Sequence, residues 1–314
     1  MKLIASIQCD KITHYGVMIG LMDEIIDRDG NHSDNDIKVQ KPIFITGAPR
    51  SGLGIIHQIL TSHHQVAFIT SNSVQSIIPH FGQKNDTQES RSLLETSSLS
   101  LLLSRLKKLI HSATRNQIQY NERQFWNKYF EPYIHTTDSD ITDEIANYYR
   151  SVVSQIQHFN NRPRFVSTMP EHSFRVLALN AIFPNAKFIQ IIRNQRIVSC
   201  SMFVKSMDKK SISNDDPYFQ NLDRILGNTR YGESSELFNY ELAVQIIISR
   251  AREAISFRGH RYLELHYEDL VSDHRQSITK ILSFCELSQN PDFVRNSCMS
   301  VHDGNEKWYP YLNT

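Results

Sequence analysis

The hydrophobic residues of this chain follow two patterns, one with helical spacing and one of short continuous runs. Apolar residues recur every three or four positions over residues 11–28, which predicts an amphipathic helix. Runs of β-branched and aromatic residues predict four strands, at 42–46, 164–168, 186–192 and 261–267. Segments with helical spacing follow the strands, for example at 195–207 and 274–286. This alternation favours a parallel sheet with helices on both of its faces.

Composition limits the kinds of partner that the protein can have. The sequence carries 34 Lys and Arg residues against 33 Asp and Glu, a net charge of +1, so no broad cationic surface attracts nucleic acid or an anionic membrane. A hydrophobic fraction of 40% excludes disorder of the whole chain. No apolar stretch is long enough for a membrane span. We therefore expect a folded protein that binds anions at local sites and does not bind nucleic acid.

The four cysteines are too few and too far apart for a disulfide framework or a zinc site. Free thiols are typical of a reducing compartment, and the apolar stretch at the N-terminus is too short for a signal peptide. We therefore expect a cytoplasmic location. The composition leaves the formation of homo-oligomers open.

A loop bounded by glycines follows the first predicted strand and precedes a helix. In Gly47-Ala-Pro-Arg-Ser-Gly52, four residues separate the two glycines, which is the spacing of a P-loop. Backbone N–H groups and the helix dipole make such a turn an anion site. A nucleotide-hydrolysing P-loop continues with Lys and then Ser or Thr, but Leu53 and Gly54 stand there. Arg50 instead supplies a cation inside the loop, although a tight turn without a ligand would explain the same spacing.

A second anion position is predicted at the end of the strand 186–192. Arg193 follows this strand directly, and open α/β sheets bind their ligands at the carboxyl ends of the strands. Ser201 comes eight residues later, two turns along the next helix, so it can share a face with the start of that helix. A surface arginine and an unrelated helical serine are the alternative interpretation.

These two motifs and three others resemble those of the sulfotransferases that use 3′-phosphoadenosine-5′-phosphosulfate (PAPS). The family's 5′-phosphosulfate loop resembles IFITGAPRSGLGIIHQIL, and its 3′-phosphate motif resembles FPNAKFIQIIRNQRIVSCSMF. The KSPEH-like segment of bacterial and Golgi-type members is similar to FVSTMPEHSFRVLAL, and two later motifs are similar to YLELHYEDL and EKWYPYL. All five occur in the order of the family, over residues 42–312.

The resemblance implies a fold, a reaction and a donor. The fold is a single α/β domain over residues 41–314, with a P-loop-type central parallel sheet flanked by helices. Residues 1–40 precede it as a helix and a polar loop, and a helical insertion at about 84–160 covers the active-site cleft. The reaction transfers the sulfuryl group of PAPS to a hydroxyl or amine of a small-molecule or carbohydrate acceptor. It leaves 3′,5′-ADP and requires no metal.

The matched motifs also imply roles for individual residues. Arg50 contacts the transferring sulfuryl group and the 5′-phosphate, as its place in the loop motif implies. Backbone groups of four residues cradle the 5′-phosphate: Ser51, Gly52, Leu53 and Gly54. Arg193 and Ser201 hold the 3′-phosphate, and Lys307 in the C-terminal motif adds a further phosphate contact.

Three features depart from the family pattern. Leu53 and Gly54 replace a pair of threonines, and Thr168 replaces the lysine before the PEH triplet. No carboxylate follows the helix after the loop where the family places its base, so His80 and His172 become the candidates for the general base. Two alternatives therefore stay open. One is a nucleotide-binding protein of the same fold with impaired catalysis, and the other is a P-loop kinase with an aberrant loop.

Overall fold

The computed structural model describes residues 39–70, 122–207, 222–227, 236–256, 260–306 and 308. The chain divides into two compact units, Met1–Asp36 with Ile69–Lys128 and Ile37–Phe68 with Tyr129–Thr314. In the first unit, residues 122–126 are helical, and the rings of Phe125 and Trp126 pack edge to face. The predicted helix at 11–28 and the part of the predicted insertion before residue 122 lie outside the described residues. Every described strand belongs to the second unit.

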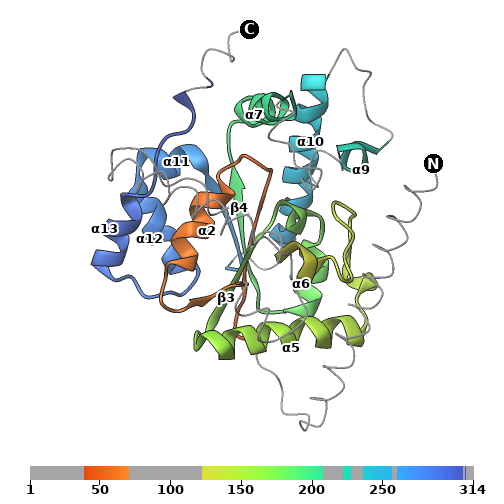
Figure 1. The fold of residues 1–314 in the computed structure, drawn as a ribbon, viewed down its shortest axis with the longest axis vertical. Coiled ribbons are helices and arrows are strands. Elements are labelled where there is room, and N and C mark those ends of the chain that lie inside the picture. The colour runs from red at the N-terminus through yellow and green to blue at the C-terminus, as the bar shows by residue number, and fades with distance from the viewer. Residues whose placement is uncertain are drawn as a thin grey trace, which may run out of the picture. The chain divides into compact units, whose positions relative to one another are not determined.

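The strands of the second unit form a parallel sheet (Figure 1). Four of them lie where the sequence predicts strands: β1 (Ile43–Gly47), β3 (Arg164–Thr168), β4 (Lys187–Ile192) and β5 (Tyr262–His266). A fifth, β2 (Val66–Ala67), has two residues, too few to show a pattern. Within the described residues the order is β2-β3-β1-β4-β5, and each neighbouring pair is parallel. The predicted α/β class with a central parallel sheet is confirmed.

Helices follow the strands, as the alternation in the sequence predicts. α2 (Leu53–Thr61) follows β1, and η2 (Pro170–Phe174) with α6 (Val176–Ile182) follows β3. α7 (Gln195–Met207) follows β4, and α11 (Tyr267–Ser272) with α12 (His274–Phe284) follows β5. The other elements named in this unit are η1 (Asp138–Asp140), α5 (Asp143–Asn160), α9 (Leu222–Leu226), α10 (Glu236–Ala251), η5 (Arg252–Ser256) and α13 (Pro291–Cys298). Figure 1 shows α2, α12 and α13 on one side of the sheet and α6 and α10 on the other.

The strands β1 and β4 are buried on both faces, which explains why they consist mostly of apolar residues. Successive side chains of a strand point to opposite faces. Ile43 and Ile45 of β1 pack into an apolar cluster with residues of α2 and α12, among them Ile56. Phe44 points the other way and stacks with Phe188 of β4. Since each fully buried side chain of this size contributes about 1.5–3 kcal/mol, this packing holds the carboxyl ends of the strands firmly in place.

The described part of the predicted insertion contains α5, whose ends follow simple capping rules. Thr142 accepts a hydrogen bond from the backbone N–H of Ile145 at the start of the helix. Asn161 follows its last residue in the left-handed region, with φ 49°. Among the described residues, no helix combines the length and the apolarity that crossing a membrane requires.

Candidate functional site

The loop between β1 and α2 has a backbone that admits few residue types. Gly47 has φ 144° and Gly52 has φ 106°, values that favour glycine. A Cβ atom on Gly47 would lie 2.6 Å from the carbonyl oxygen of Ile191, and one on Gly52 would lie 2.6 Å from Cδ2 of Tyr267. Arg50 has a positive φ of 69°, which is strained for a residue with a side chain. The loop is therefore packed tightly against β4 and α11.

The start of α2 offers hydrogen-bond donors to an anion. Gly52, the residue before the first turn, has no side chain with which to cap the N–H groups there. Uncapped N–H groups and the helix dipole attract negative charge. The hydroxyl of Ser51 is buried and has no hydrogen-bond partner among the described residues. These groups together form the first predicted anion position.

The second predicted position lies directly beside the first. Gly47 pairs with Ile191 in the register of β1 and β4, so Arg193 emerges next to the loop. Nη1 of Arg193 donates a hydrogen bond of 2.9 Å to the backbone oxygen of Arg50. Nε of Arg50 donates one of 3.1 Å to Oγ of Ser201 on α7. The three side chains therefore meet in one place, although 143 positions separate the two arginines in the sequence.

The guanidinium of Arg193 is buried and incompletely paired. Its Cζ lies 4.3 Å from the ring centre of Tyr267, and its Nε donates to Oδ1 of Asn305 at 2.8 Å. Nη2 is buried and has no hydrogen-bond partner among the described residues. Burial is the main cause that lowers the pKa of Arg193 from its usual value, and the nearby Arg50 cation adds to the shift. A buried cation with an unused donor fits an anionic ligand, because pairing offsets the cost of burying the charge.

Three residues of this arrangement, Tyr267, Gly304 and Asn305, are missed by the sequence interpretation. Oη of Tyr267 donates to the backbone oxygen of His302 at 3.1 Å and accepts from the N–H of Gly304 at 2.9 Å. Tyr267 thus supports both the loop at Gly52 and the segment that carries Asn305. These contacts join residues far apart in the chain, so no local pattern marks them. The nearest signal is the YEDL motif, which begins at Tyr267.

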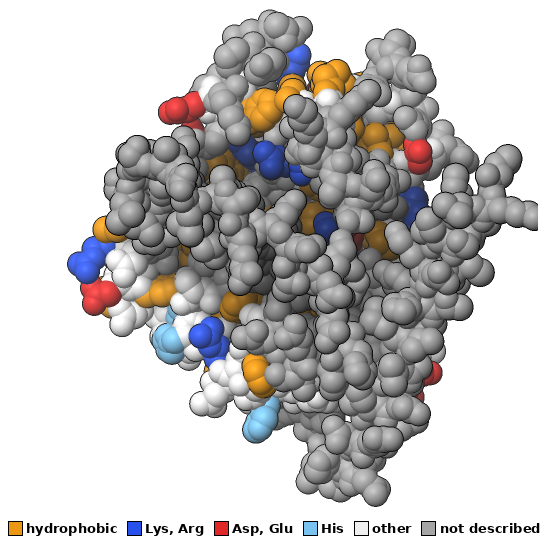
Figure 2. Space-filling view, in the orientation of Figure 1, with side chains coloured by type: hydrophobic (Ala, Val, Ile, Leu, Met, Phe, Trp, Pro, Cys, Tyr) orange, Lys and Arg blue, Asp and Glu red, His pale blue; other side chains and the backbone are white. Residues whose placement is uncertain are grey.

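Cationic side chains gather where the strands end. Figure 2, in the orientation of Figure 1, shows Lys and Arg side chains grouped below α7, in the region of the upper ends of the strands. Arg50 and Arg193 belong to this edge, since they follow β1 and β4. The attraction for anions is therefore local, as the net charge of +1 requires.

The short helix η2 has one hydrogen bond to the start of the loop and one to the segment around Thr136. Oγ of Ser173 accepts one of 3.2 Å from the N–H of Gly47, the last residue of β1. The backbone oxygen of Phe174 accepts one of 2.9 Å from the N–H of Thr136. The segment around Thr136 therefore fixes η2, and η2 in turn fixes the start of the anion loop.

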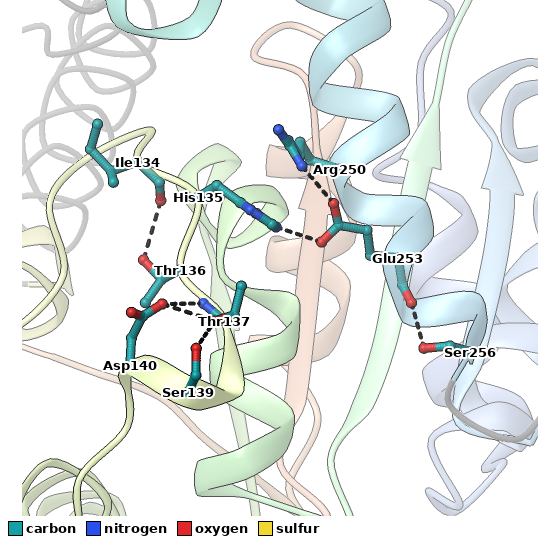
Figure 3. Close-up of polar contacts among 9 residues, drawn as sticks. All are labelled: Ile134, His135, Thr136, Thr137, Ser139, Asp140, Arg250, Glu253 and Ser256. Carbon is teal, nitrogen blue, oxygen red and sulfur yellow. Dashed lines mark hydrogen bonds and ion pairs between the residues drawn. The ribbon is translucent and has the colours of Figure 1, made fainter.

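Polar contacts hold that segment against α10 and η5 (Figure 3). Nε2 of His135 lies 2.7 Å from one carboxylate oxygen of Glu253, and the other oxygen accepts a hydrogen bond of 2.9 Å from Arg250. The N–H of Thr137 donates to Oδ2 of Asp140 at 2.7 Å, which closes the turn of η1. Elements that lie before β3 and after β4 in the sequence thus hold the segment that supports η2.

His172, a predicted candidate for the general base, is enclosed in the core. Its side chain has no exposed area, and its Nε2 lies 2.5 Å from Oγ of Ser167 in β3. The ring packs edge to face on Phe44. Burial holds the pKa of His172 well below its usual value, and the Arg175 cation lowers it further. A neutral, enclosed imidazole suits the packing of η2 against the sheet, so catalysis by His172 stays a prediction without geometric support.

Two other predicted site residues, His80 and Lys307, lie outside the described residues. Leu53 is 9% exposed and packs in the apolar cluster that contains Ile56. Its side chain therefore stabilises the fold, and the backbone alone is left to face a ligand. Gly54 has no side chain, so at positions 53 and 54 only backbone N–H groups can bind a phosphate.

A different histidine, His57 of α2, lies near the loop, at a position of the loop motif to which the resemblance assigns no role. Its Nδ1 is 3.0 Å from Oγ1 of Thr168, at the carboxyl end of β3. The ring packs edge to face with Phe68, with the ring centres 6.0 Å apart. In the sequence, His57 is marked only by its position in the second turn of the helix after the loop. Any residue type at that position would have the same signal, so it does not point to a histidine.

The fold is a P-loop-type α/β fold, and both predicted anion positions lie at the carboxyl ends of β1 and β4. The Sulfotransferase family matches this sequence over residues 42–291. The chain belongs to that family.

Two solved structures have a similar fold. Sulfotransferase STF9 from Mycobacterium avium has a TM-score of 0.52 and 14% identity, and the match covers 94% of this chain and 73% of that one. Sulfotransferase STF1 from Mycobacterium tuberculosis H37Rv has a TM-score of 0.52 and 16% identity, and the match covers 89% of this chain and 75% of that one. At these identities the likeness concerns the fold alone. A comparison with curated proteins finds no match.

Proposed function

We propose that this protein is a PAPS-dependent sulfotransferase, which transfers a sulfuryl group to a hydroxyl or amine of a small-molecule or carbohydrate acceptor. Membership of the sulfotransferase family supports the type of reaction. The observation that carries the choice of donor is the buried Nη2 of Arg193, which lacks a partner among the described residues and lies beside the loop. A 3′-phosphate distinguishes PAPS from ATP, and it needs a second anion position next to that of the 5′-phosphate.

The two anion positions divide the phosphates of the donor between them. The 5′-phosphate takes the N–H groups at the start of α2 and the buried hydroxyl of Ser51. The 3′-phosphate binds to the side chains of Arg193 and Ser201. Arg50, which is bonded to Ser201, supplies a cation to the 5′-phosphate and the sulfuryl group. Each hydrogen bond to a charged group contributes about 1.5–3 kcal/mol, so a few such bonds decide which nucleotide binds.

The donor supplies an activated sulfuryl group, and the residues of the chain orient it and neutralise charge. As in phosphoryl transfer, negative charge develops on the leaving oxygen, here that of the 5′-phosphate. Arg50 and the N-terminus of α2 stabilise this charge, because both present positive charge at fixed positions. Orientation of the two reactants lowers the barrier further. A general base takes the proton of the acceptor, and the scheme needs no metal.

The proposal also places the protein in the cytoplasm. Cys200 and Cys285 are buried free thiols, a state that reducing compartments preserve. Burial raises the pKa of Cys285 to about 12. This thiol therefore stays protonated and unreactive at neutral pH.

Ligand titration tests the donor, and radiolabelled PAPS tests the transfer. In isothermal titration calorimetry we expect 3′,5′-ADP to bind about tenfold or more tightly than 5′-AMP, because it occupies both anion positions. A preference for ATP over 3′,5′-ADP would instead identify a P-loop kinase. Binding of 3′,5′-ADP without transfer of label to any of a panel of hydroxyl and amine acceptors would identify a binding protein with impaired catalysis.

A further inference from the structure

The two hydrogen bonds of the Arg193 guanidinium both go to neutral oxygens. Nη1 donates to the backbone oxygen of Arg50 at 2.9 Å, and Nε donates to the side-chain amide oxygen of Asn305 at 2.8 Å. Nη2 is buried and donates to none of the described residues. None of the ion pairs in the described part of the chain includes Arg193. The charge of this buried side chain is therefore not neutralised by a carboxylate in direct contact.

Arg252 shows how the same side of a guanidinium binds a carboxylate. Its Nε and Nη2 donate to the two carboxylate oxygens of Glu264, each over 3.0 Å. Nε and Nη2 thus form a fork that a carboxylate or a phosphate can occupy completely. In Arg193 the amide of Asn305 occupies only the Nε half of this fork, because an amide has one oxygen where a carboxylate has two.

The segment that carries Asn305 is fixed by its own contacts. The N–H of Asn305 donates to Oδ1 of Asp303 at 2.7 Å, and its backbone oxygen accepts from the N–H of Trp308 at 2.8 Å. Oη of Tyr267 holds the N–H of Gly304. Asn305 is 3% exposed, and its Nδ2 makes no hydrogen bond to any described residue. The amide therefore stays on Nε of Arg193, and Nδ2 could be replaced by another atom without the loss of a contact.

The surroundings of Nη2 offer it no other acceptor. Two carboxylates lie near enough to raise the pKa of Arg193, Glu268 and Asp303, but they accept hydrogen bonds from the backbone N–H groups of Asn194 and Asn305. A Cβ atom on Gly304 would lie 3.5 Å from Nη2, so this glycine is adjacent to Nη2 and has no side chain that could pair with it.

We propose that Asn305 determines the specificity for a 3′-phosphate, a proposal that rests on the proposed function. Its neutral amide fixes the plane of the Arg193 guanidinium through Nε and leaves Nη2 and the positive charge to the 3′-phosphate of PAPS. Aspartate has nearly the same shape, but its second oxygen would accept from Nη2 and its charge would repel the phosphate. The residue type at position 305, in addition to Arg193, then decides whether a nucleotide with a 3′-phosphate is preferred.

Substitutions at position 305 in the full chain test the proposal by calorimetric titration of 3′,5′-ADP and 5′-AMP. We expect Asn305→Asp to raise the Kd of 3′,5′-ADP about 100-fold or more, because a hydrogen bond to a charged group is lost and repulsion is added. The Kd of 5′-AMP should rise less than about fivefold, since this ligand has no 3′-phosphate. Asn305→Ala leaves the whole fork to the phosphate, so the Kd of 3′,5′-ADP should rise less than about tenfold.

The order of the two variants separates a specificity residue from a structural one. A structural role predicts the larger loss in Asn305→Ala, because aspartate keeps the shape of asparagine and alanine does not. In thermal denaturation we expect Asn305→Asp to melt at or above the wild-type temperature, since it pairs Nη2, and Asn305→Ala to melt below it. Asn290→Asp adds the same charge at an exposed residue that caps α13, where aspartate caps as well as asparagine. As the matched control, it should leave both Kd values unchanged.

Three results overturn the proposal. They are a wild-type preference for 3′,5′-ADP in Asn305→Asp, tighter binding of 3′,5′-ADP by Asn305→Asp than by Asn305→Ala, and a lower melting temperature of Asn305→Asp with similar losses for both ligands. The proposed function fails in a different way: the wild-type protein would then bind 3′,5′-ADP no more tightly than 5′-AMP.

Discussion

The side chain of Arg193 makes several contacts at the same time. Its substitution by alanine is the most direct test of the proposed donor site. Its Nη1 holds the backbone of Arg50, its Nε holds Asn305, and its plane stacks on Tyr267. Only Nη2 lacks a hydrogen-bond partner among the described residues. We expect Arg193→Ala to weaken the binding of 3′,5′-ADP far more than that of 5′-AMP, because only 3′,5′-ADP has a phosphate for Nη2.

The size of the difference follows from the hydrogen bonds that are lost. A bond from a guanidinium to a phosphate contributes about 1.5–3 kcal/mol, which corresponds to about a 10- to 150-fold change in Kd. Loss of the bond to the backbone of Arg50 loosens the loop for both ligands, by about 1 kcal/mol or about fivefold. The Kd of 3′,5′-ADP should therefore rise by about 50- to 750-fold and that of 5′-AMP by about fivefold.

Calorimetric titration of both ligands measures these changes. Arg193→Lys keeps the charge but not the planar fork, so it should recover part of the affinity for 3′,5′-ADP. Arg196→Ala removes an exposed arginine from the first turn of α7 and serves as the matched control, with affinities equal to those of the wild type. Losses of similar size for the two ligands in Arg193→Ala would refute the assignment of the 3′-phosphate to Arg193.

Two further perturbations test the fold that holds the site. Gly52→Ala would place a Cβ atom 2.6 Å from the Tyr267 ring in a backbone of φ 106°, so thermal denaturation should show a loss of about 1–3 kcal/mol. An unchanged melting temperature would show that the ring can move away. Lys187 and Lys41 donate to the carboxylate of Glu286 and hold its pKa at about 2. Because this carboxylate is half exposed, Glu286→Gln should cost only about 1 kcal/mol in urea unfolding above the ordinary pKa of 4.5, and the cost should disappear as the pH falls toward 2. A cost that is the same at every pH would contradict the ion pairs.

Four of the strands could be predicted because each is a short run rich in β-branched, aromatic and other apolar residues. β1 and β4 lie inside the sheet and are buried almost throughout, so apolar residues fill most of their positions. β3 has an apolar centre, and the edge strand β5, YLELH, alternates apolar with polar residues. β2 has no such run, since Val66 and Ala67 become a strand only through their pairing with Arg164 and Phe165. The anion loop was equally visible, because the close approach of the loop to β4 and α11 requires glycine at positions 47 and 52.

The histidines were harder to assess from the sequence than the residues of the two anion motifs. Arg50, Arg193 and Ser201 stand in motifs with a fixed spacing, and the structure brings them within hydrogen-bond distance. His172 has the right chemical type and lies after the right strand, but the ring of Phe44, on another strand, helps to enclose it. His57 lies inside the loop motif, but the motif gives it no role, and its contact with Thr168 spans 111 positions in the sequence.

The sequence by itself determined the kind of each element around the site and the presence of two anion motifs, because periodicity and turn glycines act over a few residues. Only the tertiary structure decided which side chains meet at the ends of the strands. Tyr267 against Gly52, Asn305 on Arg193 and Thr168 on His57 all depend on the order of the strands and on the helices packed over them. That order follows from burial of the whole core, which is a property that no single segment carries.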